Sequence, residues 1–192
     1  DSGEYAKFRS TCNDFQKMNL DCFEDIAHKV MGNEYRNLPM LLQLAMMFDR
    51  YMHHVDSVIP HLENGVHVVA DRDFLSTLAY SAGDNVAWRP LLWAHEEILG
   101  NAFIMPDILL VIDVAVEVGL KRTMAKQGGK KDYFDTKDRL AKIRKRYLEL
   151  SRTPDIIRNT YCVVIHDSDA SVEDVHEEIW HYVRPVVGID SL

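Results

Sequence analysis

Three short apolar runs limit the fold of this 192-residue chain more than any other feature of its sequence. They begin near residues 66, 107 and 162 and end at Asp71, Asp113 and Asp167. Helical patterns fill the intervals between them. Alternating strands and helices are typical of βαβ units, in which helices cover both faces of a parallel sheet. We therefore predict an α/β fold, and we expect the runs at 66 and 107 to be strands buried on both faces.

The spacing of apolar residues and the capping signals predict where the helices lie. The first two are expected at about 13–32 and 37–62, the second with a kink at Pro60. A short helix capped by a hydroxyl side chain, with Ser76 and Thr77 near its start, is expected after the first apolar run. The remaining helices are expected at about 86–99, 116–126, 136–151 and 171–185.

Charge and cysteine content exclude several classes of protein. The formal net charge of −8 disfavours a general nucleic-acid-binding protein, which normally carries a basic face. Cys12, Cys22 and Cys162 are widely spaced and form no C-x-x-C pair, as expected of thiols in a reducing compartment. No signal peptide is visible, and no apolar stretch reaches the roughly 20 residues of a membrane span. We predict a single cytoplasmic domain over residues 1–192, with no membrane or nucleic-acid partner and no metal-binding histidines.

The dipeptide Asp71-Arg72, at the end of the first run, is the first candidate for chemistry. In open α/β sheets ligands bind at the carboxyl ends of the strands. Arginine makes a rigid fork to phosphate oxygens, and aspartate can hold Mg²⁺ or its waters, so the pair suits a metal–phosphate substrate. Alternatively, Asp71 caps the following helix and Arg72 only pairs with it. Residue types alone leave both interpretations open.

Three motifs carry a resemblance to a known family. The segment ADRDFLSTLAYSAG (70–83) resembles the DR-x-x-x-S-x-x-A-Y segment of the thymidylate (dTMP) kinase family. LLVIDVAVEVGLKR (109–122) resembles its strand–turn–helix unit, and RKRYLEL (144–150) resembles the helix after its lid. The resemblance implies a three-layer P-loop kinase-like fold, a parallel sheet with helices on both faces. It also implies transfer of the γ-phosphoryl group of ATP to dTMP with Mg²⁺, in deoxynucleotide biosynthesis, by a homodimer.

The resemblance also implies roles for individual residues. Arg72 would grip the monophosphate, and Arg50 and Thr77 would contact the base. Tyr80 would lie under the deoxyribose, where its ring excludes a 2′-hydroxyl, and Asp71 would lie near Mg²⁺. The implied substrate-binding residues are Met46, Arg50, Arg72, Ser76, Thr77, Tyr80 and Ser81.

A basic stretch at about 122–137 matches the family's lid, which closes over the donor phosphates. A surface loop rich in lysine is the alternative that the residues themselves leave open. Lysines replace much of the arginine found in lid-catalysed members, and lysine is a point charge that cannot fork onto phosphate. The residues expected to act in catalysis are Arg72, Arg122, Lys126, Lys130 and Lys131.

The chain departs from the family pattern in several places. Asp73 stands where members have Tyr or His, and Met46 stands where they have a Phe that stacks on thymine. The segment DYFD (132–135) replaces a D-R-[FI]-E pattern. No G-x-x-x-x-G-K-[ST] loop is present, although the family has this phosphate loop before the region that DSGEYAKFR (1–9) resembles. We therefore expect a domain that is incomplete at its N-terminus, without the first strand and phosphate loop, and no direct pairing between the strands at 66 and 107.

Two other functions are considered beside dTMP phosphorylation. One is a nucleotide-binding protein of the same fold that has lost catalysis. The other is a deoxynucleoside kinase of related fold, which the E-V-G-L-K-R and A-Y matches disfavour.

Overall fold

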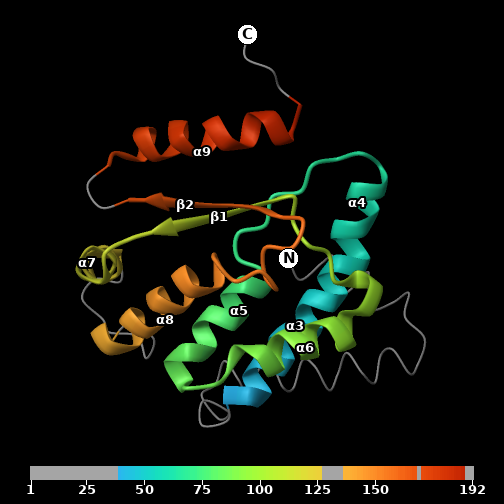
Figure 1. Ribbon diagram of the computed structural model, residues 1–192, viewed down its shortest axis with the longest axis horizontal. Coiled ribbons are helices and arrows are strands. Elements are labelled where there is room, and N and C mark those ends of the chain that lie inside the picture. The colour runs from blue at the N-terminus through green and yellow to red at the C-terminus, as the bar shows by residue number, and fades with distance from the viewer. Residues whose placement is uncertain (1–38, 127–135, 168–169, 189–192) are drawn as a thin grey trace.

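The computed structural model describes residues 39–126, 136–167 and 170–188. Two parallel strands, β1 (Ile108–Asp113) and β2 (Tyr161–His166), pair along their whole length and end with Asp113 opposite His166. Helix α9 (Val172–Val186) covers one face of this sheet, and α8 (Lys137–Leu150) lies on the other side (Figure 1). The layered α/β architecture with a parallel sheet is therefore confirmed.

Most of the predicted helices are present within a residue or two of the expected bounds. Thr136 caps α8 and Ser171 opens α9 with a capping box that includes Asp174, so the local signals determine these helix starts. The expected helix at about 13–32 lies outside the described residues. The other helical elements, in chain order, are α3 (Pro39–His53), η1 (His54–Val58), α4 (Ile59–Glu63), α5 (Phe74–Tyr80), η2 (Ser81–Asp84), α6 (Trp88–Leu99), η3 (Gly100–Ala102) and α7 (Val116–Lys126).

The long helix predicted at 37–62 changes its geometry before Pro60. The segment η1 is a π-helix, in which the backbone N–H of Ile59 donates to the carbonyl of His54. Proline has no N–H to donate, and the wider turn that precedes it accommodates the missing bond. The irregularity therefore lies at 54–58, and Pro60 falls in the first turn of α4.

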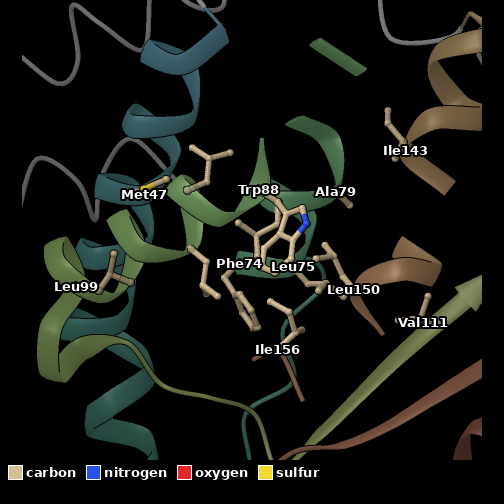
Figure 2. Packing of buried hydrophobic residues seen from close by; sticks show 13 residues of the cluster. Met47, Phe74, Leu75, Ala79, Trp88, Leu99, Val111, Ile143, Leu150 and Ile156 are labelled. Carbon is tan, nitrogen blue, oxygen red and sulfur yellow. The ribbon is translucent and has the colours of Figure 1, made fainter. Parts of the chain in front are cut away.

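The core lies between α3, α5, α6 and α8, with β1 at its edge. Figure 2 shows Phe74 and Leu75 of α5 at its centre, with Trp88 of α6 and Leu150 of α8 beside them. Phe74 is almost fully buried and meets Phe103 edge to face at a centroid distance of 5.3 Å. This packing fixes α5, whose N-cap, Asp73, directly follows Asp71-Arg72.

The prediction of a buried strand at 66–70 is wrong for the described structure. The segment is extended but exposed, and Val69 keeps 95% of its surface accessible. A strand needs a neighbour that exchanges backbone hydrogen bonds with it, and the only sheet in the described parts of the chain pairs β1 with β2. Ile112 of β1 is also 46% exposed, so β1 is not buried on both faces as expected. The segment and β1 do not pair, and a further strand between them stays a prediction.

Candidate active site

The turn at Asp71-Arg72 has a strained backbone. Arg72 has a φ of 68°, in the left-handed region that side chains other than glycine avoid at a cost of about 1 kcal/mol. Such strain is concentrated at functional sites, where the surrounding structure maintains it. Both side chains are exposed, and the guanidinium of Arg72 lies 5.2 Å from the centre of the Tyr80 ring. The turn thus presents a cation next to an aromatic ring, with a carboxylate adjacent in sequence.

Helix α5 starts from Asp73, whose side chain accepts a hydrogen bond of 2.7 Å from the backbone N–H of Phe74. The predicted hydroxyl cap is wrong, and so is the alternative that Asp71 is the cap. Carboxylates are good caps because they satisfy the free N–H groups of the first turn. The cap residue, Asp73, is also one of the residues that depart from the family pattern.

Ser76, Thr77 and Tyr80 lie at helical spacing along α5. The Tyr147 hydroxyl of α8 donates to the Ser76 hydroxyl over 2.8 Å, and the Tyr80 and Tyr147 rings meet at 90° with centroids 6.4 Å apart. Burial raises the pKa of Tyr147, so this phenol remains protonated as a donor. Helix α8 thereby fixes this side of α5.

Arg50 reaches α5 from α3. Its Nη1 and Nη2 atoms each lie 3.3 Å from the Thr77 hydroxyl oxygen, which accepts from them. Its Nε forms an ion pair with Asp73, and its Nη1 lies 2.9 Å from Nε2 of His95. The structure therefore brings together Arg50 and Thr77, the two residues that the resemblance assigns to the base.

Two histidines that the sequence did not single out complete this group. Burial, assisted by the nearby Arg50 charge, lowers the pKa of His95 to about 4. The hydrogen bond to Asp73 raises the pKa of His54, although burial acts against it. Burial alone would raise the pKa of Asp73, but His54 and Arg50 together hold it below its ordinary value. His95 lies on the buried stripe of α6, and a titratable residue on an apolar stripe is the signal that could have found it.

Other predicted site residues lie apart from this group. Ser81 is fully buried, and its hydroxyl donates to the carbonyl of Leu78 over 2.7 Å and has the carbonyl of Val86 as a longer second contact at 3.2 Å, so it secures the end of α5. Met46 is 48% exposed on α3. The side chain of Lys126, together with Lys130 and Lys131, lies outside the described residues.

Charged residues also meet at the carboxyl ends of the two strands. Arg144 of α8 donates to both carboxylate oxygens of Asp113 over 2.6 and 2.8 Å, and His166 lies 3.2 Å away. The bonds from Arg144 lower the pKa of Asp113. Arg122, expected at the lid, donates to Asp167 over 2.6 and 3.3 Å. These arginines are committed to carboxylates in the structure.

Asp71 is the candidate residue for holding Mg²⁺. Across the residues with described side chains, no three acidic, histidine or cysteine groups converge as a metal site. Mg²⁺ usually takes one or two protein carboxylates and completes its shell with water and substrate phosphates. A single exposed carboxylate followed directly by an exposed arginine, as at Asp71-Arg72, fits that pattern.

A parallel sheet with helices on both faces, and arginines gathered at a helix start and at the strand ends, are typical of α/β enzymes that transfer phosphoryl groups between nucleotides. Residues 11–179 match the family described as thymidylate kinase, and the chain belongs to this family of phosphotransferases. None of the described helices is long and apolar enough to cross a membrane.

Three relatives illustrate the match. A thymidylate kinase from Kosmotoga olearia is 29% identical over 81% of this chain and 72% of its own length. One from Bradyrhizobium sp. is 36% identical over 68% of this chain and 57% of its own length. A probable thymidylate kinase from Archaeoglobus fulgidus is 28% identical over 84% and 75%, respectively.

Proposed function

We propose that the protein is a nucleoside monophosphate kinase that transfers the γ-phosphoryl group of ATP to dTMP, giving ADP and dTDP. The observation that carries the assignment of the acceptor is the arrangement around the start of α5. There Arg50 meets Thr77, and the strained Arg72 lies over Tyr80. The family match supports the same reaction.

Each of these residues has a role in binding the acceptor. Arg72 binds two oxygens of the dTMP phosphate, since a guanidinium forks onto phosphate. Arg50 and Thr77 meet the base, and the Tyr80 ring excludes a 2′-hydroxyl at the sugar. Phosphoryl transfer depends chiefly on positioning and charge neutralisation, so fixing the acceptor phosphate is itself a catalytic contribution.

In the reaction an oxygen of the dTMP phosphate attacks the γ-phosphorus of ATP, and the bond from that phosphorus to the bridging oxygen breaks as ADP leaves. Mg²⁺ supplies charge neutralisation at the phosphate oxygens, and we propose that Asp71 holds it. The basic residues at 122–131 remain our candidates for contacts to the donor.

Binding measured by titration calorimetry tests the acceptor site without requiring turnover. Arg72→Ala should weaken dTMP binding at least about tenfold, because the phosphate loses a bidentate charged partner. Arg89→Ala is the matched control, since Arg89 is an exposed arginine of α6 paired with Asp155. Equal dTMP affinity in both variants would remove Arg72 from the site.

Release of ADP, followed with dTMP, dUMP, dCMP and dGMP, tests the reaction and its base preference. Turnover should be fastest with dTMP. Binding of dTMP without any transfer would instead favour a nucleotide-binding protein, and phosphorylation of thymidine would favour a deoxynucleoside kinase. Tyr80→Ala should reduce the preference for deoxyribonucleotides over ribonucleotides; an unchanged preference would exclude Tyr80 from the sugar contact.

We further propose that the protein acts in the cytoplasm as a homodimer that uses the surface of α3 and α4. Apolar side chains on this surface are 40–48% exposed, and in the proposed dimer they pack against a second copy. They are Met46, Phe48 and Leu62. Sedimentation equilibrium of the wild type and of a Met46→Glu variant tests this, since a charge at such an interface should favour the monomer.

A further inference from the structure

Arg50 is held in place by several residues, of which Asp73 and His95 have no assigned role in binding or catalysis. Its Nε is paired with Asp73, while its Nη1 and Nη2 atoms contact His95 and Thr77. Only 13% of the Arg50 side chain is accessible. A buried guanidinium without a carboxylate would be costly, and its long side chain could adopt several rotamers. The surrounding contacts therefore determine where its donor groups point.

The hydrogen-bond chemistry defines how His95 contributes. Its Nδ1 lies 2.7 Å from the Leu91 carbonyl, which can only accept, so Nδ1 carries the proton. Its Nε2 faces Arg50, which can only donate, so Nε2 presents a lone pair. His95 is neutral and acts as an acceptor that fixes one Nη1 hydrogen of Arg50.

His54 has the opposite role. Its Nδ1 lies 2.7 Å from the carbonyl of Ala102 and therefore donates. Its Nε2 lies 3.5 Å from Asp73 Oδ2, where a proton on Nε2 makes a favourable contact with the carboxylate. His54 is only 4% exposed, and it stands four residues after Arg50 on the same side of the helix that turns into η1.

Asp73 is the centre of this arrangement. One carboxylate oxygen, Oδ1, receives the Phe74 N–H and Arg50 Nε, and the other faces His54. The same side chain thus caps α5, which carries Thr77, and holds Arg50, which contacts Thr77. The relative position of the two base-contacting residues is fixed by one carboxylate.

We propose that Asp73 and His54 are positioning residues that hold Arg50 against Thr77 and thereby make the site select a nucleobase with a carbonyl, and not an amino group, at the edge that meets Arg50. The inference rests on the proposed function, since it takes Arg50 to face the base. Arginine has five donors and no acceptor, so a base carbonyl can pair with it and an exocyclic amino group cannot. A misplaced Arg50 loses this discrimination, because a site built to hydrogen-bond a particular group rejects analogues that lack it.

The test compares affinities for dTMP and dCMP, which carry a carbonyl and an amino group, respectively, at the same ring position. Asp73→Asn removes the charge but keeps a good helix cap. It should weaken dTMP binding about tenfold while dCMP binding changes less than about twofold, so the ratio of affinities falls. His54→Gln should lower the same ratio about threefold. Asp56→Asn is the control, since Asp56 is an exposed carboxylate of η1, and it should leave the ratio unchanged.

The ratio separates positioning from general damage. Equal weakening of dTMP and dCMP by Asp73→Asn would show that Asp73 acts only in folding and would overturn the proposal. If Asp73→Asn does not fold, His54→Gln decides, because it leaves the cap intact; an unchanged ratio there overturns the proposal as well. A wild-type protein that binds no dTMP refutes the proposed function and this inference together. A wild type that binds dTMP, with Asp73→Asn indistinguishable from it, refutes this inference alone.

Discussion

Two clusters in the molecule each join one aspartate to one arginine and one histidine, and they differ in which charge is buried. The helical cluster consists of Arg50, His54 and Asp73. The strand-end cluster consists of Asp113, Arg144 and His166. In the helical cluster the arginine and histidine side chains are 13% and 5% accessible, and the carboxylate is 26% accessible. In the strand-end cluster the carboxylate is 4% accessible, against 43% and 67% for the arginine and histidine.

This difference in burial determines how each cluster responds when one charged partner is removed. A buried cation cannot exchange a lost partner for water, so the helical cluster depends on its carboxylate. The exposed cations of the strand-end cluster are hydrated when their partner is removed, so the contribution of that pair is small and sensitive to solvent. The same three residue types thus form a helical cluster that depends on its carboxylate and a strand-end cluster whose cations can turn to water.

The largest expected effect is an acid sensitivity caused by His95, which contacts Arg50 of the helical cluster. Its pKa is about 4 in the folded protein, below the ordinary 6.5, so the unfolded chain takes up the proton first as the pH falls. The free energy of unfolding should therefore decrease by about 3 kcal/mol between pH 6.5 and pH 4 on account of this group. Urea unfolding of the wild type and of His95→Gln across this range measures it, and the variant should show the shallower pH dependence.

His54 should act in the opposite direction. Its pKa is raised, so the stability it contributes is complete below pH 6.5 and is lost as the pH rises through the folded value. The groups that face it are Asp73, Arg50 and the Ala102 carbonyl, with His53 and His95 nearby. The acid sensitivity itself is assigned to His95. A His95→Gln variant whose stability follows the same pH curve as the wild type would contradict this assignment.

The second prediction compares removal of the two carboxylates. Asp73→Asn should reduce the free energy of unfolding by about 2 kcal/mol, because Arg50 is left buried without a counter-charge. Asp113→Asn should cost about 1 kcal/mol, because Arg144 can turn to water. Both are measured by urea unfolding at pH 7, with the exposed Asp56→Asn as the control expected to change by less than about 0.5 kcal/mol. A larger cost at Asp113 would reverse the comparison.

The parts of this molecule that the sequence predicted are those that local signals determine. The starts of α8 and α9 follow from Thr136 and Ser171, whose side chains act within one helical turn. The segment 66–70 has the composition of a strand, but forming one depends on a neighbour far away in the chain, and composition contains no information about that neighbour. The strand prediction failed for this reason.

The same contrast between local signals and contacts distant in sequence applies to the candidate site. The resemblance anticipated that Arg50 and Thr77 would share a function, and the structure brings them into contact across 27 positions of sequence. The residues that hold Arg50 were not predicted from the sequence. Asp73 stood out only as a departure from the family pattern, and His95 lies 45 positions from Arg50 along the chain. Capping and periodicity describe single elements, whereas this network joins α3, η1, α5 and α6.

The smallest expected effect is the salt dependence of the two ion pairs. A double-mutant cycle with Arg144→Gln and Asp113→Asn should give a coupling free energy of about 1 kcal/mol at low salt, falling by about 0.5 kcal/mol in 1 M NaCl. The cycle with Arg50→Gln and Asp73→Asn should change much less, because ions screen exposed charges and scarcely reach buried ones. Urea unfolding at about 0.05 and 1 M NaCl supplies both values. Equal salt sensitivity would mean that solvent reaches Arg50 as freely as Arg144, and the guanidinium would then be too mobile to select a base by its donor geometry.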